Sequence, residues 1–290
     1  MLNRLGLGVL GFGLVLGGCQ AGAPDAVDLP APSGAAFAHG GPTPDPWVAA
    51  PAGPVVFETP APHGVIVREI VLDEFTPPGV GLAFDDVDGR FFMLGVAGDV
   101  FLELDENGVF VANHPYPFPG TYSAIGVVPG AHEVLVTDTQ TYMGYRIDAD
   151  TDAVVGTFCL KPSAPVLVNT AIAYDASTDH ILVAPYTDTG FGGPTEPRLE
   201  VYDRATGVLV YERALDAAAE LLDVDPASGE IRIVSNGELI LLGAPGAADV
   251  VERLLYLELA PRYPWSWARD AATGHHWVAD AFTRTLAEVR

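Results

Sequence analysis

Five segments of the chain share one pattern, in which a short strand of β-branched and aromatic residues is followed by a polar turn and a second such strand. They are FDDVDGRFFMLG (84–95), VVPGAHEVLVTD (127–138), YDASTDHILVAP (174–185), VDPASGEIRIVS (224–235) and RDAATGHHWVAD (269–280). Their starts lie 43, 47, 50 and 45 residues apart. This near-constant spacing predicts an array of equivalent units, because self-similarity at a fixed period is typical of repeat architectures.

A second hairpin follows the first in each unit, as in LDENGVFV (104–111), IDADTDAVVGTF (147–158), YDRATGVLVYE (202–212) and the weaker GAPGAADVVERL (243–254). Two hairpins make a four-stranded blade, so the sequence predicts an all-β fold with one β-propeller of five blades. Six blades stay open if a degenerate unit lies in a loop. The fifth unit ends after three strands, and GVIVREIVLD (64–73) is predicted to supply the fourth and close the ring.

Two of the units resemble known propeller repeats. HHWVADAFTRTLAEVR (275–290) and EVLVTDTQTYMGYRID (133–148) are similar to NHL and YVTN-like repeats, whose second strand ends in a V-A-D or V-T-D step. VYDRATGVLVYE (201–212) resembles the turn of quinoprotein repeats, with Tyr211 in place of tryptophan. The resemblance implies a propeller domain over about residues 64–290, and it implies no particular activity.

The N-terminal segment MLNRLGLGVLGFGLVLGGC has one positive charge, an apolar run too short to span a bilayer, and then Cys19. It predicts a signal peptide at residues 1–18. LGGC resembles the lipobox of bacterial lipoproteins, which implies that Cys19 is diacylated and becomes the mature N-terminus. Because Gln20 is not aspartate, the resemblance implies an outer-membrane anchor facing the periplasm or the cell surface. An ordinary secretory signal that contains a cysteine is the alternative.

Residues 19–63 are rich in Ala, Pro and Gly, a composition that predicts an extended tether without a core. Over the whole chain, 49% of residues are apolar, which is ample for a folded domain beyond the tether. The formal net charge is −24, with Lys161 the single lysine, and it argues against a nucleic-acid partner. The expected partners are a membrane, through the lipid, and a protein, peptide or carbohydrate.

Aromatic residues concentrate in the loops expected on one face of the propeller, where strand two meets strand three and where one blade meets the next. An aromatic surface with a polar rim is typical of protein, peptide and carbohydrate binding. Packing of these loops against the blade ends is the alternative. The predicted partner-binding residues are Tyr116, Tyr122, Tyr142, Tyr186, Phe191, Tyr263, Trp265 and Trp267.

Acidic and amide residues end the second strand of several units on the same face. Asp138, Asn236 and Asp280 are candidate ligands for Ca²⁺, which prefers oxygen donors, and no other cofactor is expected. The alternative is that these side chains bond to neighbouring loop backbone. DDVDG (85–89) is interpreted as an acidic hairpin turn, because the downstream glutamate of a calcium loop is missing.

The paired histidines His275 and His276 are interpreted as part of a blade hairpin, since consecutive strand residues point to opposite sides. His132, His180 and His275 recur at equivalent positions, too far apart around a ring to share one metal ion. Cys159 lies in a predicted outer strand and is expected to be a small buried apolar residue that does not pair with Cys19.

The sequence lacks the short motifs of hydrolases, kinases and dehydrogenases, so a non-enzymatic binding module is the first hypothesis. The alternative is a Ca²⁺-dependent lactonase or esterase that resembles the gluconolactonase and paraoxonase propellers. That resemblance implies metal-binding roles for Asn113, Asp138, Asn169, Asn236 and Asp280. Those families have six blades and a glutamate ligand, neither of which is evident in this chain. A quinoprotein dehydrogenase requires more blades and repeated tryptophan turns.

Overall fold

The structure is a computed structural model that describes residues 65–72, 81–95, 100–161, 167–188, 194–225, 227, 229–235, 238–242, 250–253, 264–280 and 283–290. The chain divides into two compact units, Met1–Phe37 and Ala38–Arg290, and every described residue belongs to the second. The predicted signal peptide, Cys19 and the tether therefore lie outside the described residues.

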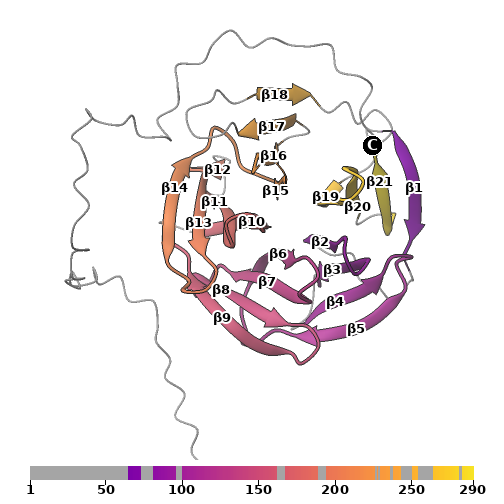
Figure 1. Cartoon of the computed structure of the whole chain (residues 1–290), viewed down its shortest axis with the longest axis horizontal. Helices are drawn as coiled ribbons and strands as arrows, with labels where there is room; N and C mark the ends of the chain where they lie inside the picture. Colours follow the sequence, from indigo (N-terminus) through magenta and orange to yellow (C-terminus); the bar gives the residue numbers. More distant parts are fainter. Residues whose placement is uncertain are drawn as a thin grey trace, which may run out of the picture. The chain divides into compact units, whose positions relative to one another are not determined.

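The described residues form five antiparallel sheets around a central axis (Figure 1). The first blade contains β2 (Leu82–Asp85), β3 (Arg90–Leu94), β4 (Val100–Asp105) and β5 (Phe110–Pro115). The second contains β6 (Tyr122–Val128), β7 (Glu133–Asp138), β8 (Met143–Asp148) and β9 (Ala153–Cys159). The third contains β10 (Leu167–Asp175), β11 (His180–Asp188), β13 (Arg198–Asp203) and β14 (Leu209–Ala214), with the two-residue β12 (Pro194–Thr195) paired to β11.

The fourth blade contains β15 (Leu221–Val224), β16 (Ile231–Ser235), β17 (Glu238–Leu242) and β18 (Val250–Arg253). The fifth contains β19 (Pro264–Arg269), β20 (His276–Asp280), β21 (Thr285–Val289) and β1 (Ile66–Val71). These five sheets confirm the predicted five-bladed propeller, and the six-bladed alternative is wrong. Among the described residues there is no helix, and hence no helix that could cross a membrane.

The ring closes as the sequence predicts. β1 pairs antiparallel with β21, with Ile66 opposite Val289 and Val71 opposite Thr285. The backbone of Arg290 also donates to Val65, at 3.1 Å. The strand from the beginning of the domain thus completes the last blade and covers the edge that β21 would otherwise expose.

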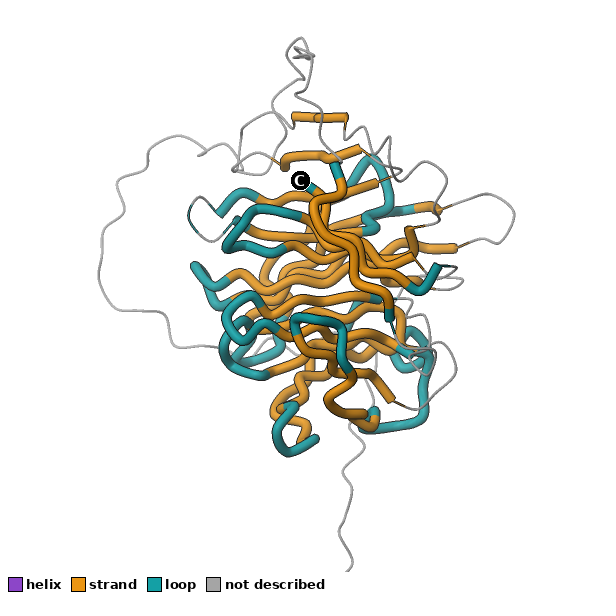
Figure 2. The backbone as a smooth tube through the Cα atoms, turned by 90° about the vertical axis from the view of Figure 1, so that its right-hand side faces the viewer, coloured by secondary structure: helices purple, strands orange, loops and turns teal. Residues whose placement is uncertain are grey.

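The core consists of five apolar clusters, each lying between two neighbouring blades. Each inner strand contacts the inner strands of both neighbouring blades, and the stacked strands are seen edge-on in Figure 2. β7 is buried along its whole length, whereas β14 alternates between half-buried and exposed residues. The inner strands therefore have continuous apolar runs, while the outer strands keep charged residues on their solvent side.

The first hairpin turn of most blades uses one local device. An aspartate accepts backbone N–H groups two or three residues later, and a residue with positive φ ends the turn. Asp85 accepts from Val87 at 3.0 Å, and Gly89 has a φ of 64°. The pairs in the other blades are Asp175 with Asp179, Asp225 with Gly229, and Asp270 with Gly274. These contacts agree with the interpretation of DDVDG as a hairpin turn.

Blades 1 and 2 are joined by a cluster that we call the histidine–glutamate junction (Glu103, His114, His132, Asp150 and Asp152). Glu103 and His114 are both 4% exposed. The ring nitrogens of His114 lie 3.0 Å from Glu103 Oε2 and 2.8 Å from Asp152 Oδ1. His132 Nδ1 lies 2.8 Å from Asp150, and its Nε2 lies 3.7 Å from Glu103 Oε1.

Blades 2 and 3 are joined by an arginine–glutamate junction (Glu133, Arg146, Arg204 and Asp179). Arg146 donates to both oxygens of Glu133, at 2.7 and 3.0 Å, and Arg204 does the same at 3.1 and 2.8 Å. Arg204 also donates to Asp179 at 3.1 Å. Glu133 is buried, so two forked guanidinium groups satisfy its carboxylate where water does not.

Candidate functional site

An aromatic cluster lies on the loop side of blades 1 and 2, made by Tyr116, Phe118, Tyr122 and Tyr145. The rings of Tyr116 and Tyr122 stack with centroids 3.8 Å apart and an interplanar angle of 12°. Phe118 lies 5.6 Å from Tyr145, measured between ring centroids. Phe118 is 39% exposed, so the cluster presents one aromatic side chain to solvent over a packed base.

The loop that carries this cluster is held by hydrogen bonds. The Tyr122 hydroxyl donates to the Phe118 carbonyl at 2.8 Å. Gln140 Nε2 donates to Thr121 Oγ1 at 2.7 Å, and the backbone of Thr121 donates to Asp138 Oδ1 at 3.0 Å. The aromatic loop is therefore tied both to itself and to the loop after β7, which fixes its conformation before any partner arrives.

Gly120 is required at the top of this loop. A Cβ atom there would lie 2.6 Å from Asp138 Oδ2, a separation that Cβ atoms essentially never show. Glycine thus lets the backbone approach the buried carboxylate of Asp138 closely enough for the neighbouring N–H of Thr121 to donate to it.

The phenol of Tyr116 stays neutral at physiological pH. Its burial and the neighbouring Tyr122 raise its pKa well above the usual value near 10. It is therefore a packing and stacking group in this cluster, and not a proton donor or acceptor for chemistry near neutral pH.

The other predicted aromatic residues that the structure describes lie apart from this cluster. Tyr142 is half-buried and packs against the apolar cluster between blades 2 and 3. Tyr186 is half-buried in β11. Trp267 is only 4% exposed and lies in the wall of the central cavity. Phe191, Tyr263 and the side chain of Trp265 lie outside the part of the chain that the structure describes.

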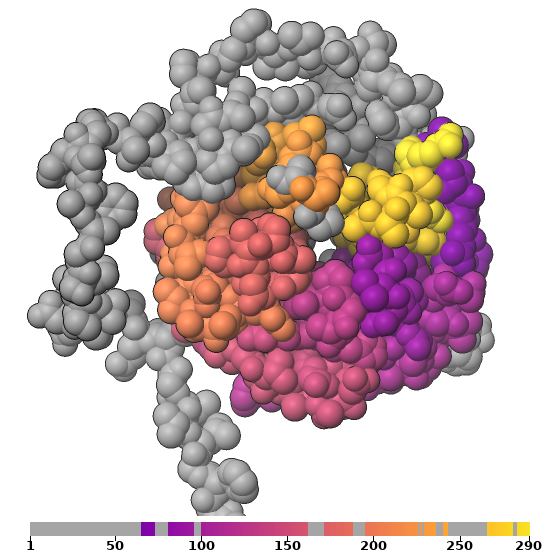
Figure 3. Space-filling model, in the orientation of Figure 1, coloured from indigo at the N-terminus to yellow at the C-terminus, as the bar shows by residue number. Residues whose placement is uncertain are grey.

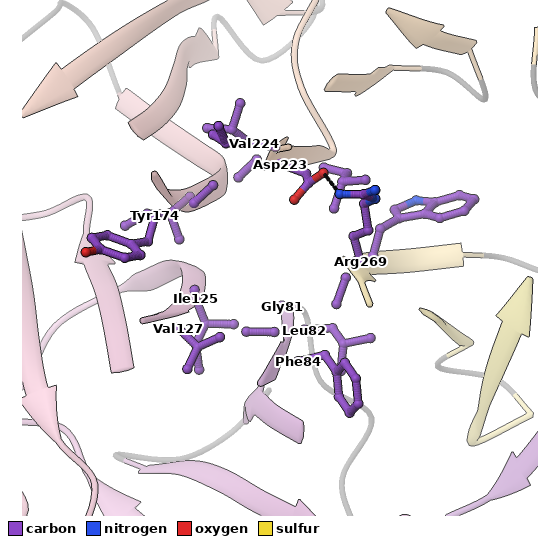
Figure 4. Close-up of a pocket in the computed structure, with 18 of the residues that line it drawn as sticks. Gly81, Leu82, Phe84, Ile125, Val127, Tyr174, Asp223, Val224 and Arg269 are labelled. Carbon is purple, nitrogen blue, oxygen red and sulfur yellow. Dashed lines mark hydrogen bonds and ion pairs between the residues drawn. The ribbon is translucent and has the colours of Figure 1, made fainter. Parts of the chain in front are cut away.

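A central cavity of about 130 Å³ runs between the inner strands β2, β6, β10, β15 and β19 (Figure 4). The space-filling view shows its opening at the middle of the ring (Figure 3). In this ring Arg269 Nη1 donates to Asp223 Oδ2 at 2.9 Å (Figure 4). Burial raises the pKa of Asp223, and this effect outweighs the opposing charges of Arg269 and Arg232.

Sequence reasoning missed this charged pair, although a signal was present. Asp223 occupies the inner-strand position held by Ala83, Gly126, Ala173 and Ala268 in the other blades, as the strand registers show. Arg269 occupies the next position, where the other blades have Phe84, Val127, Tyr174 and Val224. Two charged residues at otherwise apolar positions mark a deviation from the repeat, which is where functional residues are often found.

The predicted metal ligands occupy the ends of second strands. Asp138, 0% exposed, accepts from Thr121 N and Gln140 N through Oδ1 and from the Thr141 hydroxyl through Oδ2, at 3.0, 3.0 and 2.6 Å. Asp280 is buried and accepts from Thr283 N at 3.1 Å. Neither residue lines the central cavity.

The remaining predicted metal ligands are the three asparagines. Asn236 and the side chain of Asn169 lie outside the described residues, and Asn113 is exposed in β5. Within the described ranges, no group of three His, Cys, Asp or Glu side chains is placed to hold a metal ion. The contacts of Asp138 are those expected of a side chain that bonds to neighbouring loop backbone.

The histidine and cysteine predictions have different outcomes. His275 Nδ1 lies 2.6 Å from Glu288 Oε1, so this histidine is engaged within its own blade. Cys159 is exposed in β9, with its sulfur 3.8 Å from that of Met143. The expectation of a small buried apolar cysteine is therefore wrong, because β9 is an outer strand and Cys159 is on its solvent side.

Comparison with known proteins identifies the fold and no closer relationship. No family model and no curated protein sequence matches the chain. Among solved structures, the chain is similar to Myxococcus xanthus glutaminyl cyclase, with a TM-score of 0.54 and 13% identity, covering 78% of this chain and 95% of that one.

Two further solved structures are similar at lower scores. The WD40 domain of Neurospora crassa Pan2 has a TM-score of 0.45 and 11% identity, covering 72% of this chain and 61% of that one. A streptogramin B lyase has a TM-score of 0.47 and 11% identity, covering 76% of this chain and 69% of that one. At these identities the likeness concerns the β-propeller fold, which hosts many unrelated functions.

Proposed function

We propose that the protein is an extracytoplasmic binding module, anchored by a lipid on Cys19, that engages a protein, peptide or carbohydrate through its aromatic cluster. The observation that carries the binding role is the exposed ring of Phe118, which packs on Tyr145 beside the stacked Tyr116–Tyr122 pair. Aromatic side chains with packed bases and exposed faces are the groups that dominate the energetics of many interfaces.

The order of the loop supports this role. A flexible aromatic loop would lose conformational entropy when it became ordered on binding. This loss would weaken the affinity by about 0.5 to 1.5 kcal/mol for each immobilised side chain. Here Tyr122 is bonded to the carbonyl of Phe118, and Thr121 is bonded to Asp138 and Gln140. Most of the ordering is thus complete in the unbound protein, which favours tight binding for a small contact area.

The test compares two similarly exposed phenylalanines that lie at opposite ends of blade 1. Phe118 is 39% exposed on the loop side, and Phe110 is 49% exposed beside the second hairpin turn of blade 1. A partner is first captured with the mature protein and identified, and its affinity for purified variants is then measured by calorimetry. Phe118→Ala and Tyr122→Ala are expected to weaken binding at least tenfold, and Phe110→Ala to leave it unchanged. Binding that depends on Phe110 and is indifferent to Phe118 would place the interface on the opposite side.

The proposed anchor is supported by the LGGC segment and the apolar run before it. It places the propeller at the outer membrane, facing the periplasm or the cell surface. Mass spectrometry of the mature protein tests it, since a diacylated N-terminal Cys19 has a characteristic added mass that Cys19→Ser abolishes.

A further inference from the structure

The central cavity has apolar walls and is large enough for a small organic molecule. Leu82, Ile125, Val127, Leu221 and Trp267 contribute to the walls. The volume is about 130 Å³, whereas a single water requires about 10 to 15 Å³ by the same kind of measure. The space therefore accommodates a molecule of several heavy atoms between the inner strands.

Three of the four charged residues among the described lining of the cavity lie at its hairpin end. Asp86 follows β2, Asp223 precedes the last residue of β15, and Arg269 ends β19, and all three line the cavity. At the opposite end the charged lining residue is Glu220, which is exposed. A ligand that enters the apolar space thus meets partly buried charge on one side only.

Asp86 carries negative charge that no neighbouring cation balances. It lies close to Asp85 and Asp270, and burial together with these two carboxylates raises its pKa, although hydrogen bonds from the backbone of Asp86 and Ala272 act in the opposite direction. Asp85 accepts backbone N–H groups from Val87, Asp88 and Gly130, and Asp270 accepts them from Ala272 and Thr273. Across the described part of the chain, none of these three aspartates forms an ion pair with Arg, Lys or His.

Arg269 is already committed to another carboxylate. It donates to Asp223 at 2.9 Å, and Arg232 Nη1 lies 3.8 Å from the same Asp223 oxygen. Arg232 in turn donates to Asp225 at 2.9 Å and to Glu230 at 3.1 Å. Because these arginines are balanced by their own acids, the hairpin end of the cavity keeps an excess of negative charge at Asp86.

We propose that the central cavity binds a small organic ammonium ion, whose apolar body lies between the inner strands and whose charged nitrogen meets Asp86 at the hairpin end. An ammonium group satisfies the carboxylate, and the hydrocarbon body removes the apolar walls from water. This site is separate from the aromatic cluster, which lies on the loop side of blades 1 and 2.

The ligand chemistry is tested by calorimetric titration of the full-length protein with n-butylammonium, 1-butanol and butyrate. Saturable binding of n-butylammonium is expected, with the neutral and anionic compounds at least tenfold weaker. Equal binding of 1-butanol, or unsaturable heats that vanish in moderate salt, would overturn the proposal, because the site would then lack a charge preference or the attraction would be general.

The position of the site is tested with variants at the two ends of the cavity. Asp86→Asn is expected to weaken n-butylammonium binding at least tenfold, and Glu220→Gln, at the other end, is expected to leave it unchanged. Ala271→Trp places a large side chain on an exposed lining residue at the hairpin end and is expected to block entry even if Asp86→Asn folds poorly. Unchanged binding by a folded Asp86→Asn or Ala271→Trp protein would refute the proposal, and Phe118→Ala should have no effect on it.

Discussion

The junction between blades 1 and 2 and the junction between blades 2 and 3 use a buried glutamate in the same way but give it different partners. Glu103 is joined to two imidazoles, and Glu133 is joined to two guanidinium groups. A guanidinium stays charged at any pH at which the protein folds, whereas an imidazole can release its proton near neutrality. Two contacts of similar geometry therefore respond differently to mutation and to pH.

The largest effect is expected from Glu133→Gln. This change removes the negative charge that both Arg146 and Arg204 share, and it leaves two largely buried cations without it. The free energy of unfolding should fall by about 3 to 5 kcal/mol. Urea unfolding measures it, with Lys161→Gln as the control, because Lys161 is half exposed and the loss of its pair with Glu212 should cost less than about 1 kcal/mol. Equal losses of unfolding free energy in the two variants would mean that the burial of Glu133 does not strengthen its ion pairs.

A smaller effect is expected from Glu103→Gln. An imidazole, unlike a guanidinium, is not a permanent cation, so the loss of the Glu103 charge leaves no fixed positive charge buried beside the two histidines. Arg90, with Nε 3.5 Å from Glu103 Oε1, is one-third exposed and remains solvated. We expect a loss of about 1 to 3 kcal/mol by the same urea measurement. A loss as large as that of Glu133→Gln would show that the imidazoles behave as fixed charges.

Asp138→Ala tests the loop end of the first junction. The side chain of Asp138 holds Thr121 across the boundary between blades 1 and 2, together with Gln140 and Thr141. Its removal should cost about 1 to 2 kcal/mol, as does the loss of a capping side chain.

Added Ca²⁺ should not change the Tm of the wild-type protein, since both oxygens of Asp138 already accept hydrogen bonds from loop donors. A calcium-dependent rise in Tm that Asp138→Ala abolishes would favour the metal-dependent hydrolase instead.

The smallest effect is a difference in pH dependence. Burial lowers the pKa of His132, but the hydrogen bond with Asp150 and the charges of Asp150, Glu103 and Asp88 raise it overall. Its contribution is fully present below about pH 6.5 and is lost as the pH rises through the raised pKa. Burial raises the pKa of Glu133, but Arg146 and Arg204 lower it overall. That contribution is present above about pH 4.5 and is lost as the pH falls through the lowered pKa.

Unfolding curves recorded from about pH 2 to about pH 9 should therefore show two separate losses of stability. His132→Gln should remove the alkaline loss and keep the acidic one. If this variant still lost stability as the pH rose, the loss would have to come from another titratable group. The two junctions would then not differ in their response to pH.

Local residue patterns were sufficient to predict the blades and the ring closure. Asp85 and Gly89 illustrate the reason, because a turn that begins with aspartate and ends with a positive-φ residue depends on neighbours in sequence. The pairing of β1 with β21 could be predicted because one strand was missing and one similar strand was left over.

The candidate sites could be predicted only in part. Asp223 and Arg269 belong to different blades, and their contact exists only once the ring places β15 beside β19. Trp267 was expected on the loop face, but its strand belongs to the inner position, where side chains line the cavity. Tyr116 and Tyr122 were predicted as binding residues, whereas their stacking depends on how the loop crosses between two blades.

The pairing of β1 with β21 also determines when this domain can finish folding. Ile66 pairs with Val289, and nearly the whole described domain separates these two residues in the sequence. Contacts so distant in sequence form slowly, because a long chain must be brought together before they contribute any stability. The ring cannot close before residues 285–289 have been synthesised, so β1 has no partner strand while the blades before β21 are made. A variant that lacks β21 would leave the edges of β1 and β20 exposed, and we expect it to aggregate.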